Sequence, residues 1–581
     1  MDILEFTRNK LDELVLNIDE ETGMLHGYTV PNYHSNLKPG VYHTFTQNTN
    51  FALSVFASEY EKFYPTANEI LRKTIACQCR TGECTGLWPY FYEESLEEMV
   101  APDWNMAEFN AYPMATILRV HKDKLEPGMY ELLSEACLYA CQAIQKRNLT
   151  VLYTNPVVMS IYITALCGEL LDKQELVNYA THKLTKFYLH IMNKGSFDEY
   201  NCTGYTLLIV EMFGLILRYV RNEEILQKTR ELNDLAWTMM GEHFHYETGE
   251  IVGPNFRKYV NFMSTGDLTK LQTAVSEDLQ LVKEKVYGSN DLINRLECPE
   301  HLKPLFLEKN KEVSSMRLLS KGFNYPYLGW PLVDMQYMSG NIALGSFNMM
   351  DAWNQHLPVV AYLGNREEKF CIRWRVYHDN YDFCCGHAST VQVKGAALTV
   401  TNFHTNRGDT HHDLDPVKNA TIQASDLRIR YQIEANAESI LDRVTTKVTD
   451  NVCTLDLLGT KATIGFAFAE FTGEKPYFEV TRQDKEIFVD MVLYHGEEKS
   501  IRLDQLDCAA AVSYLAVGEN EYDEPVVRKE QEFVVANWNV NGKSAEIRTL
   551  LKPMKQIPSV LSNELYLDGE NLIHLAERLS M

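Results

Sequence analysis

The sequence has no long apolar run. None of its windows approaches the roughly 18 consecutive apolar residues of a membrane-spanning helix, so we expect no membrane span. Its first residues, MDILEFTRNKLDELVLNI, form an amphipathic pattern with acids and show no basic start, apolar stretch or cleavage site of a secretory leader. The phosphate-binding patterns GxGxxG and GxxxxGK followed by Ser or Thr are also absent. These absences argue against a membrane protein and against a nucleotide-dependent enzyme.

Basic residues are few relative to the acids. Lys and Arg total 55 against 79 Asp and Glu, which gives a formal net charge of −24. This balance argues against nucleic acid or an anionic membrane as a partner, because both repel an acidic protein. A small anionic substrate is still compatible, provided that the chain supplies a local basic cluster. The sequence carries no signature of an oligomeric state.

The cysteines show no disulfide framework. There are thirteen, an odd number, at irregular positions. This pattern is typical of reduced thiols, and we expect a cytoplasmic protein. Cys77, Cys79 and Cys84 lie close together, but no second pair completes a zinc site, so buried thiols are the simpler interpretation.

Two patterns of apolar residues divide the chain near residue 312. In residues 1–311, apolar positions recur at intervals of three and four, as in PVVMSIYITALCGELL, which is typical of helices. In residues 312–581, stretches such as KFCIRWRVYHD alternate between apolar and polar residues, which is typical of strands. The helical stretches have similar lengths and are joined alternately by short turns and longer loops. The predicted fold is therefore an (α/α) toroid followed by an antiparallel β-sandwich.

Three loops of the helical region combine aromatic rings with amides and carboxylates. They are GLWPYFYEESLEEMVAPDWNMAEFN, GSFDEYNCTGYT and HFHYETGEIVGPNFRKYV. Aromatic faces pack on sugar rings and planar polar groups bind hydroxyls, so this composition favours a carbohydrate site. The alternative, left open, is that the aromatic residues only seal helix ends. The candidate binding residues of the first loop are Trp88, Tyr92, Asp103, Trp104, Asn105 and Glu108.

The strand region offers one basic cluster. In CIRWRVYHDNYDF, Arg373 and Arg375 fall on one face of a predicted strand, and Trp374 falls on the other. Two arginines on one face are the cluster that an anionic substrate requires. The alternative is an exposed face whose arginines pair with the abundant acids. His378 comes at the end of the same strand.

A second polar stretch, TNFHTNRGDTHHDLDP, contains side chains of the kind that bind metals. His404, His411 and Asp413 are ligand types for zinc or calcium. Their spacing follows no defined geometry, so a polar loop is the simpler interpretation. We therefore predict no required cofactor, and a structural divalent metal at these residues is the less favoured alternative.

Several motifs resemble those of the heparinase II/III-type polysaccharide lyases and of the related alginate and chondroitin lyases. FDEYNCTGYT resembles a Glu-Tyr-Asn-Ser-x-Thr-Tyr loop of that broad group, and GEIVGPNFRKY resembles its Gly-Pro-x-x-Arg-x-Tyr element. ALGSFNMMDAWNQHLPVVAYL is similar to the segment that opens the sheet domain of these proteins. The order of a helical toroid and an antiparallel sandwich matches as well.

The resemblance implies β-elimination at a uronic acid of an oligo- or polysaccharide. By resemblance, Asn201 and Arg257 would neutralise the substrate carboxylate, and Tyr205 or Tyr259 would transfer the proton. His378 would be a further candidate base, and Glu199 would line the site together with Asn105, Trp88 and Trp104. Arg375 would contribute positive charge for an anionic oligosaccharide. No metal takes part in this scheme.

Two alternatives use the same loops. A glycoside hydrolase needs two carboxyl groups, one of them protonated, and Asp103, Glu108, Asp198 and Glu199 are candidates. A non-catalytic scaffold that binds glycan or protein would need the aromatic loops but no acid or base.

Overall fold

The computed structural model describes residues 2–319, 331–405, 417–555 and 563–580. The chain divides into two compact units. The first, which we call the helical unit, comprises Met1–Asn193, Gly204–Thr238 and Ser264–Lys303. The second, the sheet unit, comprises Lys194–Thr203, Met239–Met263 and Pro304–Met581. Two segments from the helical part of the sequence therefore belong to the unit that contains the large sheets.

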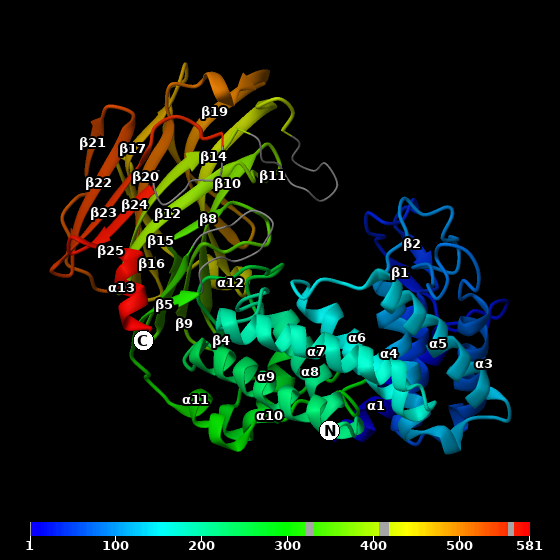
Figure 1. The fold of residues 1–581 in the computed structure, drawn as a ribbon. Helices are drawn as coiled ribbons and strands as arrows, with labels where there is room; N and C mark the ends of the chain where they lie inside the picture. Colours follow the sequence, from blue (N-terminus) through cyan, green and yellow to red (C-terminus); the bar gives the residue numbers. More distant parts are fainter. Residues whose placement is uncertain (1, 320–330, 406–416, 556–562, 581) are drawn as a thin grey trace. The chain divides into compact units, whose positions relative to one another are not determined.

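Helices dominate the first half of the chain and antiparallel strands the second, so the predicted order of α and then β is confirmed (Figure 1). Among the described residues, no helix combines the length and the apolar character needed to cross a membrane. The helices are α1 (Ile3–Leu14), α2 (Phe45–Ala57), α3 (Tyr64–Ala76), α4 (Asn105–Val120), α5 (Met129–Arg147), α6 (Thr154–Leu170), α7 (Gln174–Lys194), α8 (Thr203–Tyr219), α9 (Glu223–Glu242), α10 (Thr265–Val275), α11 (Pro304–Leu307), α12 (Glu438–Leu441) and α13 (Leu572–Leu579).

In the helical unit, helices α2 to α6 pack on neighbours in the chain and on the helix after the next. Helix α4 contacts α2, α5 and α6, and helix α5 contacts α3, α4 and α6. Helix α6 is buried on every side from Thr154 to Gly168, because its sequence has apolar or small residues all round. Helix α5 is amphipathic and buries one face, which includes Cys137 and Cys141. All thirteen cysteines lie among the described residues, and none of them forms a disulfide bond.

The sheet unit contains three larger antiparallel sheets. The large sheet is formed by β5 (Val313–Leu319), β6 (Leu332–Ser339), β7 (Ile342–Phe347), β9 (Val359–Gly364), β10 (Lys369–His378), β11 (Tyr381–Asp382), β14 (Thr421–Ala435), β18 (Tyr477–Gln483) and β19 (Glu486–Arg502). The second sheet is formed by β8 (Met349–Asp351), β12 (Gly386–Val393), β13 (Ala396–Phe403), β15 (Thr445–Thr449), β16 (Val452–Leu457), β17 (Thr460–Phe471) and β20 (Ala509–Val517). The third sheet is formed by β21 (Val526–Glu530), β22 (Phe533–Val540), β23 (Lys543–Leu550), β24 (Asn563–Leu567) and β25 (Glu570–Asn571).

Two short hairpins complete the strands. Strand β1 (Gly27–Thr29) pairs with β2 (Gly40–Tyr42) in the helical unit. Strand β3 (Phe244–His245) pairs with β4 (Glu250–Ile251) in the sheet unit.

The large sheet has an inner and an outer face. On β10, Ile372 and Trp374 belong to the core that the large sheet shares with the second sheet. The residues between them alternate to the outer face, as the period of a strand requires. There, Cys371 and Tyr362 pack against Val252 in a smaller apolar cluster. Residues 252–263 therefore cover part of the outer face, and the neighbouring part carries the arginines.

Candidate functional site

A pocket of about 650 Å³ lies on the outer face of the large sheet, within the sheet unit. Strands β10 and β14, which are paired along their length, supply one part of its lining, and residues 259–262 supply another. We call it the outer-face pocket. Its polar lining combines amides, phenols, three cations and three carboxylates, which are groups that bind hydroxyls and ions. Among these polar residues are Tyr259, Asn261, Asn354, Arg373, Arg375 and Gln432.

The two arginines of the pocket differ in their pairing. Arg375 Nε donates to Asp382 Oδ1 at 2.8 Å and its Nη1 donates to the Gln432 side chain at 2.5 Å. Arg373 is 6% exposed and makes only two long hydrogen bonds, to Asn261 Oδ1 at 3.3 Å and to the Asn354 carbonyl at 3.4 Å. Its Nε has no hydrogen-bond partner. Burial lowers the pKa of Arg373, and the positive charge of Arg375 lowers it further.

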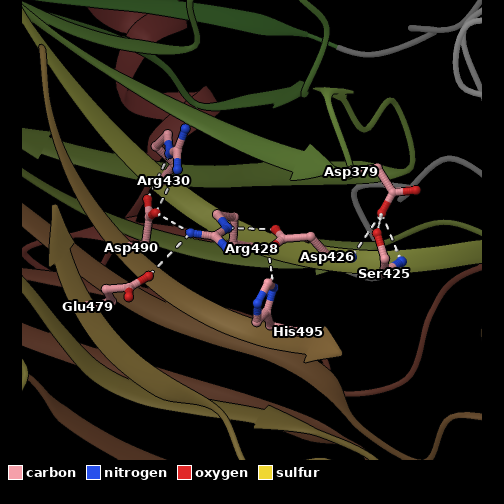
Figure 2. A network of polar contacts seen from close by, with 8 residues as sticks. All are labelled: Asp379, Ser425, Asp426, Arg428, Arg430, Glu479, Asp490 and His495. Carbon is pink, nitrogen blue, oxygen red and sulfur yellow. Dashed lines mark hydrogen bonds and ion pairs between the residues drawn. The ribbon is translucent and has the colours of Figure 1, made fainter. Parts of the chain in front are cut away.

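Other arginines of the same face are neutralised, as Figure 2 shows. Arg430 on β14 donates two hydrogen bonds to the Asp490 carboxylate, at 2.8 and 2.7 Å. Its neighbour Arg428 pairs with Asp426, Asp490 and Glu479. The expectation of an ion-paired face is therefore correct for most of these cations. Arg373 is the exception that the alternation of the strand could not reveal.

A second cluster joins the pocket through Tyr259, which is 59% exposed. Arg257 Nη2 donates to the Tyr259 hydroxyl at 3.3 Å, Nη1 donates to Glu199 Oε1 at 2.8 Å, and Nε donates to Gln355 Oε1 at 2.9 Å. Arg257 and Glu199 are both largely buried. The structure thus brings Glu199, Arg257 and Tyr259 together. The charge of Arg257 is already paired with Glu199, so this residue is poorly suited to neutralise a substrate carboxylate. Its contact with the Tyr259 hydroxyl gives it a positioning role instead.

Asn201 has a different role from the one that the resemblance implies. Its side-chain amide donates to the Val252 carbonyl at 2.7 Å and to the Pro254 carbonyl at 3.1 Å, and Asn201 is 2% exposed. The backbone carbonyl of Asn201 accepts from the Asn255 side chain at 2.9 Å. Both side-chain amide protons of Asn201 are donated to backbone carbonyls, so Asn201 links its own loop to residues 252–254. It cannot also donate to a substrate carboxylate.

A buried polar triad beside this loop has no counterpart in the sequence prediction. The Tyr200 hydroxyl donates to Asp334 Oδ2 at 2.6 Å and lies 3.1 Å from His243 Nε2. All three side chains are buried, and burial together with the Asp334 carboxylate raises the pKa of Tyr200. A phenol with a raised pKa stays protonated near neutral pH. The only sequence signal for this triad was the motif EYN, which places Tyr200 between the predicted residues Glu199 and Asn201.

His378 is a structural residue of β10. It is 9% exposed, its Nε2 lies 2.8 Å from the Gln423 carbonyl oxygen, and its ring packs edge-on against Phe383. His378 does not line the outer-face pocket. The assignment of His378 as a base, which the resemblance implied, stays a prediction that this pocket does not support.

The residues of the first aromatic loop lie in the helical unit. Trp88 is fully buried and donates to the Thr74 carbonyl at 2.8 Å, so it is a core residue rather than a sugar-binding surface. Asp103 is buried, accepts from the Tyr90 hydroxyl at 2.8 Å and accepts from the backbone of Asn105 at 2.9 Å. Tyr92 is 49% exposed and Trp104 is half-buried, so both keep an accessible ring.

Glu108 is the most perturbed carboxyl group of this loop. It is 1% exposed, and neither carboxylate oxygen has a hydrogen-bond partner. The nearest cation is Arg147, whose Nη1 lies 4.0 Å from Glu108 Oε2 and donates to Asn105 Oδ1 at 2.8 Å. Burial raises the pKa of Glu108 to about 7. It is therefore protonated for part of the time at neutral pH.

The remaining predicted residues that the structure describes do not line the outer-face pocket. Tyr205 is half-buried on the first turn of α8 and belongs to the helical unit. His404 is buried and contacts His387 edge-on, with ring centroids 5.4 Å apart. His411 and Asp413 lie outside the described residues. Within the described ranges, no three His, Cys, Asp or Glu side chains are grouped to hold a metal ion.

A family model described as a domain of unknown function (DUF8769) matches residues 43–266. No curated protein matches the sequence. The matched range ends just beyond the loop that carries Arg257 and Tyr259. It therefore includes the helical candidates and leaves out the strands that bear Arg373 and Arg375.

Several solved structures are similar to this chain. A heparinase III has a TM-score of 0.37 and 9% identity, with 94% of this chain and 90% of that chain covered. A heparan sulfate lyase from Pedobacter heparinus has a TM-score of 0.32 and 8% identity, with 95% and 90% covered. A chondroitin AC lyase from Streptomyces coelicolor A3 has a TM-score of 0.44 and 9% identity, with 94% and 87% covered. The structures to which this chain is similar thus include the kind of lyase that its motifs resemble.

Proposed function

We propose that this protein cleaves oligo- or polysaccharides that contain a uronic acid, by β-elimination at the outer-face pocket. The observation that carries the proposal is an exposed phenol, Tyr259, held by the guanidinium of Arg257 at a pocket lined by amides and arginines. The amides suit sugar hydroxyls, and the arginines suit a carboxylate.

The proposed reaction needs a base and an acid. The base removes the proton at C5 of the uronate, the bond between C4 and the leaving oxygen breaks, and a double bond forms between C4 and C5. The leaving oxygen takes up a proton, and no water is consumed. We assign Tyr259, in its phenolate form, as the base that takes the C5 proton, and the hydrogen bond that Arg257 donates to the Tyr259 oxygen stabilises that form. Tyr381 is a second phenol that lines the same pocket, and we assign it to the leaving oxygen.

A glycoside hydrolase is the rival proposal, and fewer observations support it. Of its four candidate carboxylates, Asp198 pairs with Lys194, Glu199 pairs with Arg257, and Asp103 is hydrogen-bonded within its own loop. Glu108 alone has the raised pKa that a general acid requires. A hydrolase also needs a second carboxylate at the correct distance, and these contacts provide none that is unpaired.

The replacement Tyr259→Phe tests the proposal. We expect a loss of turnover of at least about 100-fold, the usual contribution of a positioned base. The measurement is the ultraviolet absorbance of unsaturated uronate formed from a panel of oligosaccharides. Folding should be unaffected, because Tyr259 is 59% exposed and its hydroxyl lies at the pocket.

Tyr477→Phe is the matched control, since Tyr477 on β18 is 45% exposed in the same unit and does not line the pocket. This variant should turn over substrate at the wild-type rate. Equal rates for Tyr259→Phe and the wild type would remove Tyr259 from the chemistry and with it the basis of the proposal.

A further inference from the structure

The outer-face pocket holds one buried cation without a counter-ion. Arg373 makes no ion pair with a carboxylate among the described residues, and its two hydrogen bonds go to neutral oxygens at 3.3 and 3.4 Å. A buried guanidinium in this state is costly, because its hydration is lost and the only carboxylate that acts on it, Asp382, is already paired with Arg375 and makes no ion pair with Arg373. The nearby cations Arg375, Arg428 and Arg430 all have carboxylate partners, so the lack of one is specific to Arg373.

The other charges of the lining cancel or are negative. Arg375 is paired with Asp382, and Lys485 lies 3.3 Å from Glu434. Glu486 accepts a hydrogen bond from Gln432 and has no cation among the ion pairs of the described residues. The pocket therefore offers one uncompensated positive charge and, at Glu486, one negative charge that opposes any further anion.

A neighbouring acceptor is also unsatisfied. The side-chain oxygen of Asn354 is buried without a hydrogen-bond partner, and Asn354 lines the same pocket as Arg373. A cationic donor and a neutral acceptor side by side match a ligand that carries a carboxylate and a hydroxyl. A uronic acid carries both groups on one ring, the carboxylate on C5 and free hydroxyls on C2 and C3.

We propose that Arg373 is the anion-binding residue of the outer-face pocket and that it takes a single carboxylate of a sugar acid rather than a multiply sulfated unit. This inference rests on the proposed function in placing the substrate at this pocket. It goes further in assigning the anion to the sheet, not to Asn201 or Arg257, and in limiting the charge of the bound unit to one.

The first experiment measures binding without turnover. The protein carrying Tyr259→Phe is titrated calorimetrically with an unsulfated uronate oligosaccharide, with the same oligosaccharide after sulfation, and with a neutral oligosaccharide of equal length. We expect the unsulfated acid to bind most tightly. Adding Arg373→Met should weaken its binding by roughly 10- to 100-fold, the effect of a charge-assisted hydrogen bond. Equal or tighter binding of the sulfated ligand would overturn the single-anion assignment.

The second experiment separates a binding role from a structural one. Thermal unfolding is followed with and without sodium glucuronate, and with glucose as the neutral control. Glucuronate should raise the midpoint of the wild type. Arg373→Met should abolish that shift while its own midpoint, without ligand, is no lower than that of the wild type, because an unpaired buried charge has been removed.

Arg430→Met is the matched control, since Arg430 lies on β14, the strand that pairs with β10, and is hydrogen-bonded to the buried Asp490. It should lower the midpoint and keep the glucuronate shift. A destabilised Arg373→Met that still responds to glucuronate would show that Arg373 is structural. If the acid binds but no unsaturated product forms, the lyase proposal fails while the assignment of Arg373 holds.

Discussion

Two ionisable side chains of this protein are buried without the partner that usually accompanies a buried charge. Arg373 is a buried cation without an acid, and Glu108 is a buried acid without a hydrogen-bond donor. Such groups reduce stability, and strongly perturbed titratable residues cluster at functional sites. The two residues lie in different units, so each has to be tested separately.

Glu108 predicts a pH dependence of stability. Its pKa is raised from 4.5 to about 7 in the folded protein, so the folded state holds the proton more tightly than the unfolded state does. The contribution to stability is fully present below about pH 4.5 and is lost as the pH rises through 7. At pH 8 the folded state is destabilised by ~3 kcal/mol at most, since each pKa unit corresponds to about 1.4 kcal/mol.

Glu108→Gln should remove this dependence. Urea unfolding of the helical unit at pH 5 and at pH 8 should show a variant that is more stable than the wild type at pH 8 and similar at pH 5. Glu131→Gln, an exposed carboxyl on α5, is the control and should leave the pH profile unchanged. If the stability of the wild type changed between pH 5 and pH 8 by the same amount as that of Glu108→Gln, this result would contradict a raised pKa of Glu108.

For the helices and strands, the periodicity of the sequence correctly predicted which side chains face the core. The alternation in CIRWRVYH correctly places Arg373 and Arg375 on the outer face of β10 and Trp374 in the core. It could not predict the partners. Asp382 reaches Arg375 because β11 turns back on β10, and that pairing depends on a turn rather than on the period of the strand.

The loops were harder to predict because aromatic and amide residues serve both binding and packing. Trp88 and Tyr92 come from one short stretch, yet the first is a core residue and the second is exposed. Asn201 looks like a ligand-binding amide in the sequence, and its protons are used by carbonyls 51 and 53 residues further along the chain. Composition identifies such loops, but only the tertiary contacts assign their side chains.

The loop fastened by Asn201 yields a prediction at this scale. Asn201 has a left-handed backbone, with φ of 51°. Asn201→Ala should lower the free energy of unfolding by about 2 to 3 kcal/mol, from two lost hydrogen bonds and the unfavourable conformation of alanine there. Asn201→Gly loses the same bonds but accepts the conformation, so it should be about 1 kcal/mol more stable than the alanine variant.

Urea unfolding measures both Asn201 variants. Equal stabilities of the alanine and glycine variants would contradict the role of the backbone conformation. If the Asn201 variants were as stable as the wild type and lost only turnover, Asn201 would instead bind the substrate, as the resemblance implied.

At the scale of the whole molecule, the order of helices and strands follows from the sequence, but the division into units does not. Residues 194–203 and 239–263 come from the helical half and belong to the sheet unit. They bring Glu199, Arg257 and Tyr259 to the strands that carry the arginines. The site is thus assembled from segments far apart in the chain, which no local pattern reveals. A net charge of −24 repels anions, so an anionic substrate needs a local positive charge of the kind that Arg373 supplies.

The central claim, elimination rather than hydrolysis, is tested most directly by the source of oxygen in the products. An unsulfated uronate oligosaccharide is incubated with the protein in water enriched in oxygen-18, and the products are analysed by mass spectrometry together with their ultraviolet absorbance. We expect one unsaturated uronate for every new reducing end and no solvent oxygen incorporated by cleavage. Saturated products, with one solvent oxygen incorporated per cleavage at the new reducing end, would contradict it.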